Sequence, residues 1–322
     1  MNRSEILFLY DIADANPNGD PLDDNKPRLD EETEINIVTD VRLKRTIRDY
    51  LAEYKNQELF VKEVKDDEGI IQDAKLRAED YLDKKDDEKG YSNIQEAKNS
   101  MKTNILEKCI DVRLFGATIP LDVKIGKKKQ TGSITLTGPV QFRLGRSLHK
   151  VEINHIKGTG AFASGKGKSQ ATFREEYILP YSLIGFYGIV NEKAAKSTYL
   201  TDEDVNLLID GIWNGTKNLI SRSKFGQVPR LLIQIEYNEE NYFIGDLDKQ
   251  VSLTHNLDND KQIRSINDYE LNIDNILTLI DENKDKINKI HVKIDSNLKF
   301  ENIEDLKSEI ENLSVDVEEI TL

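Results

Sequence analysis

Positively charged side chains are closely spaced between residues 42 and 48, where together they could hold the phosphate groups of a polyanion. In a helix, Lys44, Arg45 and Arg48 would lie roughly 100° to 200° around the axis from Leu43. We therefore expect these three cations on one solvent-facing side. The alternative is a solvated helix whose charges form ordinary surface ion pairs, which contribute little.

The segment that carries these cations, residues 38–54, has the features of one amphipathic helix. Thr39 can cap its first turn, and Asp40 places a negative charge there. Apolar residues recur at helical spacing at Leu43, Ile47, Tyr50, Leu51 and Tyr54. The pattern predicts a helix with one buried apolar face and one basic face.

A second group of candidate anion-binding residues comprises Arg143, Arg146, His149 and Lys150. They lie on or just after a strand-like segment, where alternation could direct several of them to one face of a sheet. Residues 157–171 are glycine-rich and basic, and Phe162 is their only large apolar side chain. Next to such a hairpin, the basic strand is expected to bind a nucleic-acid backbone.

The common catalytic motifs are missing from the sequence. The four histidines are scattered, Cys109 is the only cysteine, and there is no Gly-x-Ser-x-Gly motif. Residues 160–167 approach the phosphate-loop pattern, but Gly167 occupies the Ser/Thr position, so a flexible basic loop is favoured. The carboxylates of residues 11–34 could hold a divalent cation, but their spacing does not fit a calcium loop, and a solvated acidic loop is favoured.

Net charge is distributed unevenly along the 322 residues. The total is −14, but residues 1–109 carry −9, residues 110–235 carry +8 and residues 236–322 carry −13. Because salt screens distant charges beyond about 10 Å, a polyanion would respond to the basic middle of the chain. The lone cysteine and the absence of a signal peptide or a long apolar segment predict a cytoplasmic protein that does not contact membranes.

The order of predicted elements indicates an α+β fold. A buried central strand at 5–13 is followed by a polar loop at 14–36, which we expect to lack regular structure, and by the basic helix. Strand-like segments at 110–120 and 131–144, a helix capped by Thr201 and a strand at 230–237 complete a ferredoxin-like βαββαβ order with insertions. The acidic tail should hold helices near 268–283 and 302–313, with a strand at 290–294 between them.

Several stretches resemble the backbone subunit of type I CRISPR surveillance complexes (Cascade), within the RAMP superfamily and closest to its type I-B and I-C branches. They are residues 14–21 (DANPNGDP), 27–28 (PR), 38–50 (VTDVRLKRTIRDY), 111–116 (DVRLFG), 137–141 (TGPVQ) and 145–149 (GRSLH). The similarity runs through residues 5–237 in the order that the family shows.

The resemblance implies a modified RNA-recognition palm with inserted helical fingers and a β-hairpin thumb. The palm would comprise residues 1–54 and 109–237 with the thumb at about 157–171, the fingers residues 55–108, and an acidic C-terminal extension residues 238–322. In this family, copies polymerise along one guide RNA (crRNA), and the thumb displaces a base at regular intervals. Bases between thumbs stay free to pair with target DNA.

The resemblance also implies roles for particular residues. Phe162 is the candidate wedge that displaces the base. The RNA-binding candidates are Asn18, Arg28, Thr39, Arg42, Lys44, Arg45, Arg48, Arg143, Arg146, His149, Lys166 and Lys168. Expected partners are crRNA, target DNA through the guide, copies of the chain itself, other Cascade subunits and a recruited helicase-nuclease.

The resemblance implies no catalysis, metal or cofactor, and two alternatives stay open. Related type III backbone subunits cut target RNA with a loop aspartate, and Asp14, Asp20 and Asp30 occupy a comparable region. A metal-dependent RNase is therefore the enzyme alternative. A scaffold that does not bind nucleic acid is the structural one.

Overall fold

The computed structural model describes the chain except for residues 66–67, 84–90, 127 and 164–170, and side chains are described outside residues 159–174. The chain forms two compact units. One comprises Met1, Ile47–Gln141 and Ile189–Gly211, and the other comprises Asn2–Thr46, Phe142–Gly188 and Ile212–Leu322. Each is described separately below.

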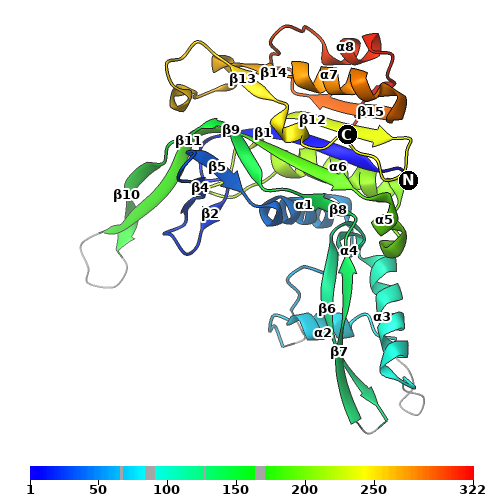
Figure 1. Ribbon diagram of the computed structural model, residues 1–322. Coiled ribbons are helices and arrows are strands. Elements are labelled where there is room, and N and C mark those ends of the chain that lie inside the picture. Colours follow the sequence, from blue (N-terminus) through cyan, green and yellow to red (C-terminus); the bar gives the residue numbers. More distant parts are fainter. Residues whose placement is uncertain (66–67, 84–90, 127, 164–170) are drawn as a thin grey trace. The chain divides into compact units, whose positions relative to one another are not determined.

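The central sheet of the larger unit is built around β1 (Ser4–Ala15), whose residues 4–12 are all buried. Its strands follow the order β16-β15-β12-β1-β11-β9-β5-β4 (Figure 1). Their bounds are β16 (Val317–Glu319), β15 (Ile287–Ile294), β12 (Val228–Tyr237), β11 (Ala171–Val190), β9 (Gly145–Lys150), β5 (Ile35–Val38) and β4 (Leu29–Asp30). Because β16 pairs parallel to β15 while β12 pairs antiparallel to β1, the sheet is mixed. The prediction of a buried central first strand is confirmed.

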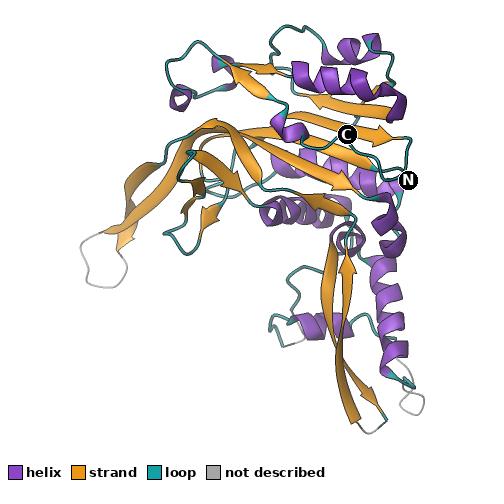
Figure 2. Ribbon diagram, in the orientation of Figure 1, coloured by secondary structure: helices purple, strands orange, loops and turns teal. Residues whose placement is uncertain are grey.

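Helices α7 (Asp274–Asn283) and α8 (Leu306–Asn312) cover one face of this sheet (Figure 2). Leu7, Leu9 and Ile233 pack there in one hydrophobic cluster with Ile280 and Ile310 of the two helices. Since neighbouring residues of a strand point to opposite faces, Phe8 is directed to the other side, and it is fully buried as well. A strand covered on both faces reads as a continuous apolar run, which is what made β1 recognisable in the sequence.

Residues 238–322 belong to this same sheet and core. They supply β15, β16, α7, α8 and an antiparallel pair, β13 (Ser252–Thr254) with β14 (Glu270–Asn272). Short 3₁₀ turns connect them: η1 (Leu247–Lys249), η2 (Asp260–Gln262), η3 (Ile266–Asp268) and η4 (Lys284–Lys286). The predicted helix, strand and helix of the C-terminal region are confirmed.

Helices α1 (Asp40–Lys55) and α6 (Asp202–Lys217) lie against each other where both belong to the smaller unit. Tyr50 donates a hydrogen bond to Asp210 (2.9 Å). A Cβ at Gly211 would come within 2.9 Å of Ile47 Cγ2, so glycine permits the close approach of the two helices. Both predicted helices are confirmed.

The smaller unit contains a hairpin, β6 (Gly116–Ile125) with β7 (Lys128–Thr137), which shares a hydrophobic core with α2 (Ala74–Glu79) and α3 (Ile94–Lys108). Helix α5 (Glu192–Thr198) belongs to the same unit, and the short strand β8 (Val140–Phe142) follows β7. The expected strand at 110–120 is wrong in its first half, because Ile110–Phe115 forms helix α4. The expected place of the strands at 110–120 and 131–144 in the ferredoxin-like sheet is also wrong for β6 and β7, because these two strands pair with each other outside the central sheet. Its buried Asp111 accepts hydrogen bonds from the backbone N–H groups of Phe60 and Val61, which holds this turn inside the unit.

The loop after β1 is more regular than predicted. Residues 19–38 contain β2 (Gly19–Asp20) paired with β3 (Lys26–Pro27), followed by β4 and β5, which join the edge of the central sheet. Strand β10 (Asn154–Ala163) pairs antiparallel with β11 as a hairpin. In the part of the chain that the structure describes, no helix is long and apolar enough to cross a membrane.

Candidate nucleic-acid interface

The N-terminus of α1 is fixed by the polar loop that precedes it. Asn18 Oδ1 accepts hydrogen bonds from the backbone N–H of Thr39 (2.8 Å) and from its hydroxyl (2.9 Å). Thr39 Oγ1 in turn accepts a hydrogen bond from Arg42 N (3.3 Å). Asn18 therefore positions the helix start, and its carbonyl oxygen is engaged in that task.

The cations of α1 do not share one solvent face, so this prediction is wrong in part. Arg45 is exposed. Lys44 has a side chain only 12% exposed, and it pairs with Asp40 one turn earlier (3.0 Å). Arg48 is only 13% exposed and donates to Asp111 (3.0 Å).

Arg48 belongs to the core of the smaller unit. Its guanidinium lies 5.1 Å from the centre of the Phe115 ring, and its carboxylate partner Asp111 is completely buried. Removing one partner of a buried ion pair strongly destabilises a protein, and the contact with the Phe115 ring adds to the interaction. Arg48 therefore stabilises the fold. The angles of the side chains around the helix axis could not predict this ion pair, because Asp111 is distant from Arg48 in the sequence.

Two more predicted residues lie near the start of α1 with polar partners of their own. Arg28 donates to Asp20 (2.8 Å), which links the two ends of the β2–β3 turn. Arg42 donates to Thr46 Oγ1 (2.9 Å) one turn further along α1. These contacts orient both guanidinium groups in the larger unit.

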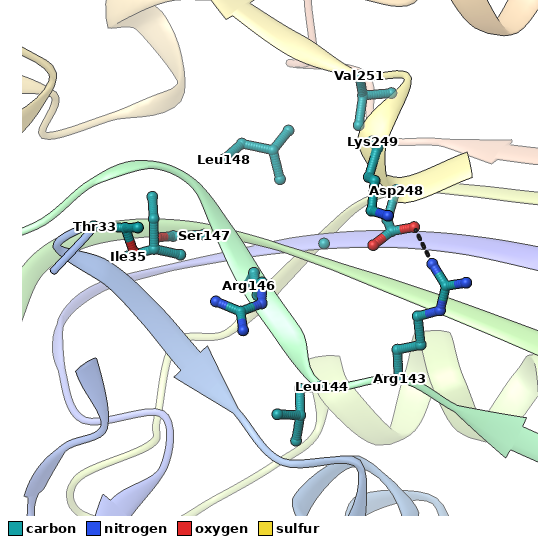
Figure 3. A pocket seen from close by; sticks show the side chains of 11 residues that line it. Thr33, Ile35, Arg143, Leu144, Arg146, Ser147, Leu148, Asp248, Lys249 and Val251 are labelled. Carbon is teal, nitrogen blue, oxygen red and sulfur yellow. Dashed lines mark ion pairs between the residues drawn. The ribbon is translucent and has the colours of Figure 1, made fainter. Parts of the chain in front are cut away.

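Strand β9 and the residues before it line an open cavity of about 650 Å³. Its lining combines cations with apolar side chains: Thr33, Ile35, Arg143, Leu144, Arg146, Ser147, Leu148, Gly185, Asp248, Lys249 and Val251. Figure 3 shows Arg143 and Asp248 pointing toward each other across one end of it. Three cations and one carboxylate line the cavity, and two further carboxylates, Asp30 and Asp246, pair with its arginines.

Carboxylates already neutralise the two predicted cations of this cavity. Arg143 pairs with Asp246 and lies 3.5 Å from Asp248, and it stacks over the Tyr187 ring at 4.6 Å. The hydrogen bond from Arg143 lowers the pKa of Asp246 below its usual value. Arg146 pairs with Asp30 (3.3 Å). Both guanidinium groups are about half exposed, so a phosphate could replace either carboxylate.

His149 is not a surface residue, which argues against its prediction as an RNA contact. It is 2% exposed, its Nδ1 bonds to the Lys150 carbonyl (2.9 Å), and its Nε2 accepts from Leu183 N (3.2 Å). Burial lowers the pKa of His149, and the ring packs on Tyr181. Alternation along β9 explains this burial, because Arg146 and Lys150 point outward while His149 points inward.

The remaining predicted residues cannot be assigned contacts. Lys166 and Lys168 lie outside the described residues, and the side chain of Phe162, on β10, does too. No role was predicted for Lys224 or Lys249 from the sequence, although Lys249 lines the cavity and Lys224 lies near Arg42. The only available signal for Lys224 was a run without acidic residues at 211–235.

The aspartates considered for metal-dependent catalysis have separate environments. Asp20 pairs with Arg28 and Asp30 pairs with Arg146, while Asp14 is exposed at the end of β1. Among the residues that the structure describes, no group of three or more His, Cys, Asp or Glu side chains is placed to hold a metal ion.

A mixed, largely antiparallel sheet covered by helices, with cations at one helix N-terminus and along one strand, defines a protein of the α+β class. The family model described as CRISPR-associated protein Cas7 matches residues 2–274. A CRISPR-associated protein Cas7 from Haloferax volcanii is 34% identical over 316 residues, which cover 94% of this chain and 89% of the relative. The chain therefore belongs to the Cas7 family, and the family expected from the sequence is confirmed.

A solved structure shows the same fold. The chain aligns with one from a CRISPR RNA-guided surveillance complex, pre-nicking, with a TM-score of 0.54 and 11% identity. The alignment covers 99% of this chain and 96% of that one.

Proposed function

We propose that this protein is the guide-RNA-binding backbone subunit of a type I CRISPR surveillance complex, and that it has no catalytic role of its own. Membership of the Cas7 family supports this proposal. The observation that carries it is the gathering of Arg28, Arg42 and Arg45 at the start of α1 in the same compact unit as Arg143 and Arg146 of the β9 cavity. RNA binding by such a surface depends on phosphate contacts.

The topology supports assigning the palm to the central sheet together with α1 and α6. The order β12-β1-β11-β9, with α1 after β1 and α6 between β11 and β12, matches a ferredoxin-like βαββαβ arrangement of the kind found in RNA-recognition folds. In this proposal the β10–β11 hairpin is the thumb, with Phe162 as its wedge, and the smaller unit contains the fingers.

The chemical role follows from which atoms contact the RNA. Arginines that bind phosphates leave base edges free, so the guide can pair with target DNA while the protein reads the backbone. Copies of the chain would bind successive segments of one crRNA, next to other Cascade subunits and a recruited helicase-nuclease.

The proposal can be tested by expressing the full chain with and without a guide RNA array. We expect a large assembly that protects RNA from nuclease, with exposed nucleotides at a constant interval. Arg45→Glu should reduce the bound RNA at least about tenfold, because it reverses an exposed charge at the start of α1.

The matched control is Lys193→Glu, a charge reversal at an exposed position on α5 of the smaller unit. This control should bind RNA like the parent protein. A protein that remains a nucleic-acid-free monomer in the presence of guide RNA would refute the proposed function.

A further inference from the structure

The loop between α6 and β12, residues 218–226, presents apolar and basic side chains to solvent. Ile220 is 82% exposed and Phe225 is 71% exposed, with Arg222 exposed between them. The loop is held in shape by its own turn, because Lys224 N (3.2 Å) and Phe225 N (2.9 Å) both donate to the Ser221 carbonyl. Gly226 ends the turn with φ +87°, a conformation that favours glycine.

This loop is attached to the polar segment that fixes the start of α1. The backbone N–H of Asn16 donates to the Ser223 carbonyl (2.7 Å). Asn16 is only 2% exposed, and its side-chain amide donates to the Asn25 carbonyl (2.7 Å). Two residues later, Asn18 holds Thr39. The loop 218–226 and the α1 N-terminus are therefore positioned by the same short segment.

The loop also carries positive charge without an acidic counterpart. Residues 211–235 contain four cations and no Asp or Glu. Lys224 is half-buried, and among the described residues its ammonium donates to Ser223 Oγ (3.2 Å) and forms no ion pair. The charged group that acts on it is Arg42, and this repulsion adds to burial in lowering the pKa of Lys224. An anion bound to Lys224 would favour its charged form and offset this repulsion.

We propose that loop 218–226 is a further part of the guide-RNA site, in which Lys224 binds a backbone phosphate and Phe225 stacks on an RNA base. This inference rests on the proposed function and adds residues to it. The charge of the loop favours a polyanion over an apolar protein partner. An exposed aromatic ring beside lysine and arginine is the combination that single-stranded nucleic acids bind, since every base has a face that can stack.

The test uses the full-length protein and a short fluorescein-labelled single-stranded RNA, titrated by fluorescence anisotropy at several KCl concentrations. Lys224→Gln should weaken binding roughly fivefold and reduce the slope of log affinity against log salt by about 0.7, the value for one phosphate contact on a single strand. Lys224→Arg should restore both. Phe225→Ala should weaken binding roughly tenfold and leave the salt slope unchanged, because stacking releases no counterions.

Two variants outside the loop serve as controls. Lys307→Gln removes a partly exposed lysine of α8, and Phe243→Ala removes a half-exposed phenylalanine of the C-terminal region. Both should bind RNA with the affinity and salt slope of the parent. Ultraviolet irradiation of the parent complex should give a nucleotide adduct on Phe225, which a purely structural role would not produce.

Failure of the inference can be distinguished from failure of the proposed function. If the parent binds RNA while Lys224→Gln and Phe225→Ala bind it equally well, the inference is overturned and the proposed function stands. If Phe225→Ala instead weakens self-association and leaves RNA affinity unchanged, the loop contacts a neighbouring copy, and the inference is again overturned. A parent protein that binds no RNA would overturn both.

Discussion

The cations of strand β9 and those near the α1 N-terminus differ in their counterions. Arg143 and Arg146 are about half exposed, yet each already holds a carboxylate: Asp246 for the first and Asp30 for the second. Lys224 is less accessible but has no carboxylate partner among the described residues. A phosphate must displace an ion pair at β9, whereas at Lys224 it would supply a missing counterion. Exposure alone is therefore a poor guide to where a polyanion binds most strongly.

A single helix contains a further contrast. Arg45 and Arg48 are one turn apart on α1, but Arg45 is exposed while Arg48 pairs with a buried aspartate. Arg48 has the same charge as Arg45 but serves folding. The three predictions below concern a cation that stabilises the fold, a cation paired with carboxylates at the surface, and a buried histidine on the same strand.

The largest expected effect concerns Asp111. Asp111→Ala removes the partner of Arg48 and leaves the N–H groups of Phe60 and Val61 without their acceptor. Breaking a buried ion pair on one side costs about 3–5 kcal/mol, so the free energy of unfolding should fall by about that amount. Urea denaturation followed by circular dichroism measures it.

The control for this prediction is Asp281→Ala, which breaks the exposed pair between Asp281 of α7 and Lys284. It should change the free energy of unfolding by less than about 1 kcal/mol. If Asp111→Ala is as stable as this control, the pair of Arg48 with Asp111 does not stabilise the fold, and Arg48 is again a candidate RNA contact.

An intermediate effect, opposite in sign to most substitutions, is expected at the β9 cavity. Asp246→Asn combined with Asp248→Asn frees Arg143 from both carboxylates. The same change releases Lys249, which pairs with Asp246 (3.1 Å). RNA affinity should rise about threefold to tenfold, and the salt slope should steepen by about 0.7 for each released cation that binds a phosphate. Fluorescence anisotropy at several salt concentrations measures both quantities.

Removal of any two acidic groups makes the protein less negative, so a matched control is needed. Asp258→Asn with Glu270→Gln neutralises two exposed acids elsewhere in the C-terminal region. Its effect on affinity should be smaller, and its salt slope should stay that of the parent. Equal gains in the two double variants would mean that Arg143 does not face RNA.

The parts of the fold that depend on local pattern could be predicted from the sequence. Strand β1 is a continuous apolar run, and α1 and α6 carry both a cap and helical spacing, so all three were placed correctly. Residues 110–115 were misassigned because their helix depends on Asp111, whose partners lie about fifty residues earlier. A pattern within one window contains no information about such partners.

The candidate site was predictable in its residue types but not in their surroundings. His149 could have been assigned to the core, since it has the opposite parity to Arg146 and Lys150 on the same strand. The pairing of Arg143 with Asp246 could not, because the two residues are 103 positions apart. Lys224 had no motif of its own, and its proximity to Arg42 depends on how the loop 218–226 is attached at Asn16.

The smallest expected effect separates His149 from the cations beside it on β9. Burial lowers its pKa in the folded protein below 6.5. The hydrogen bond with the Lys150 carbonyl and the charge of Asp260 oppose this shift, whereas His255 and Arg264 add to it. The unfolded chain takes up a proton near pH 6.5 while the folded chain does not, so its contribution to stability is complete above that pH and is lost as the pH falls. Between pH 7 and pH 6 this loss of stability amounts to at most about 0.7 kcal/mol.

Urea denaturation at pH 7 and pH 6 should show this loss of stability in the parent and a smaller loss in His149→Gln, whereas RNA affinity should change equally in both proteins. A drop in RNA affinity for His149→Gln alone would instead show that His149 contributes to RNA binding. That result would contradict the role inferred from its burial and its two backbone hydrogen bonds.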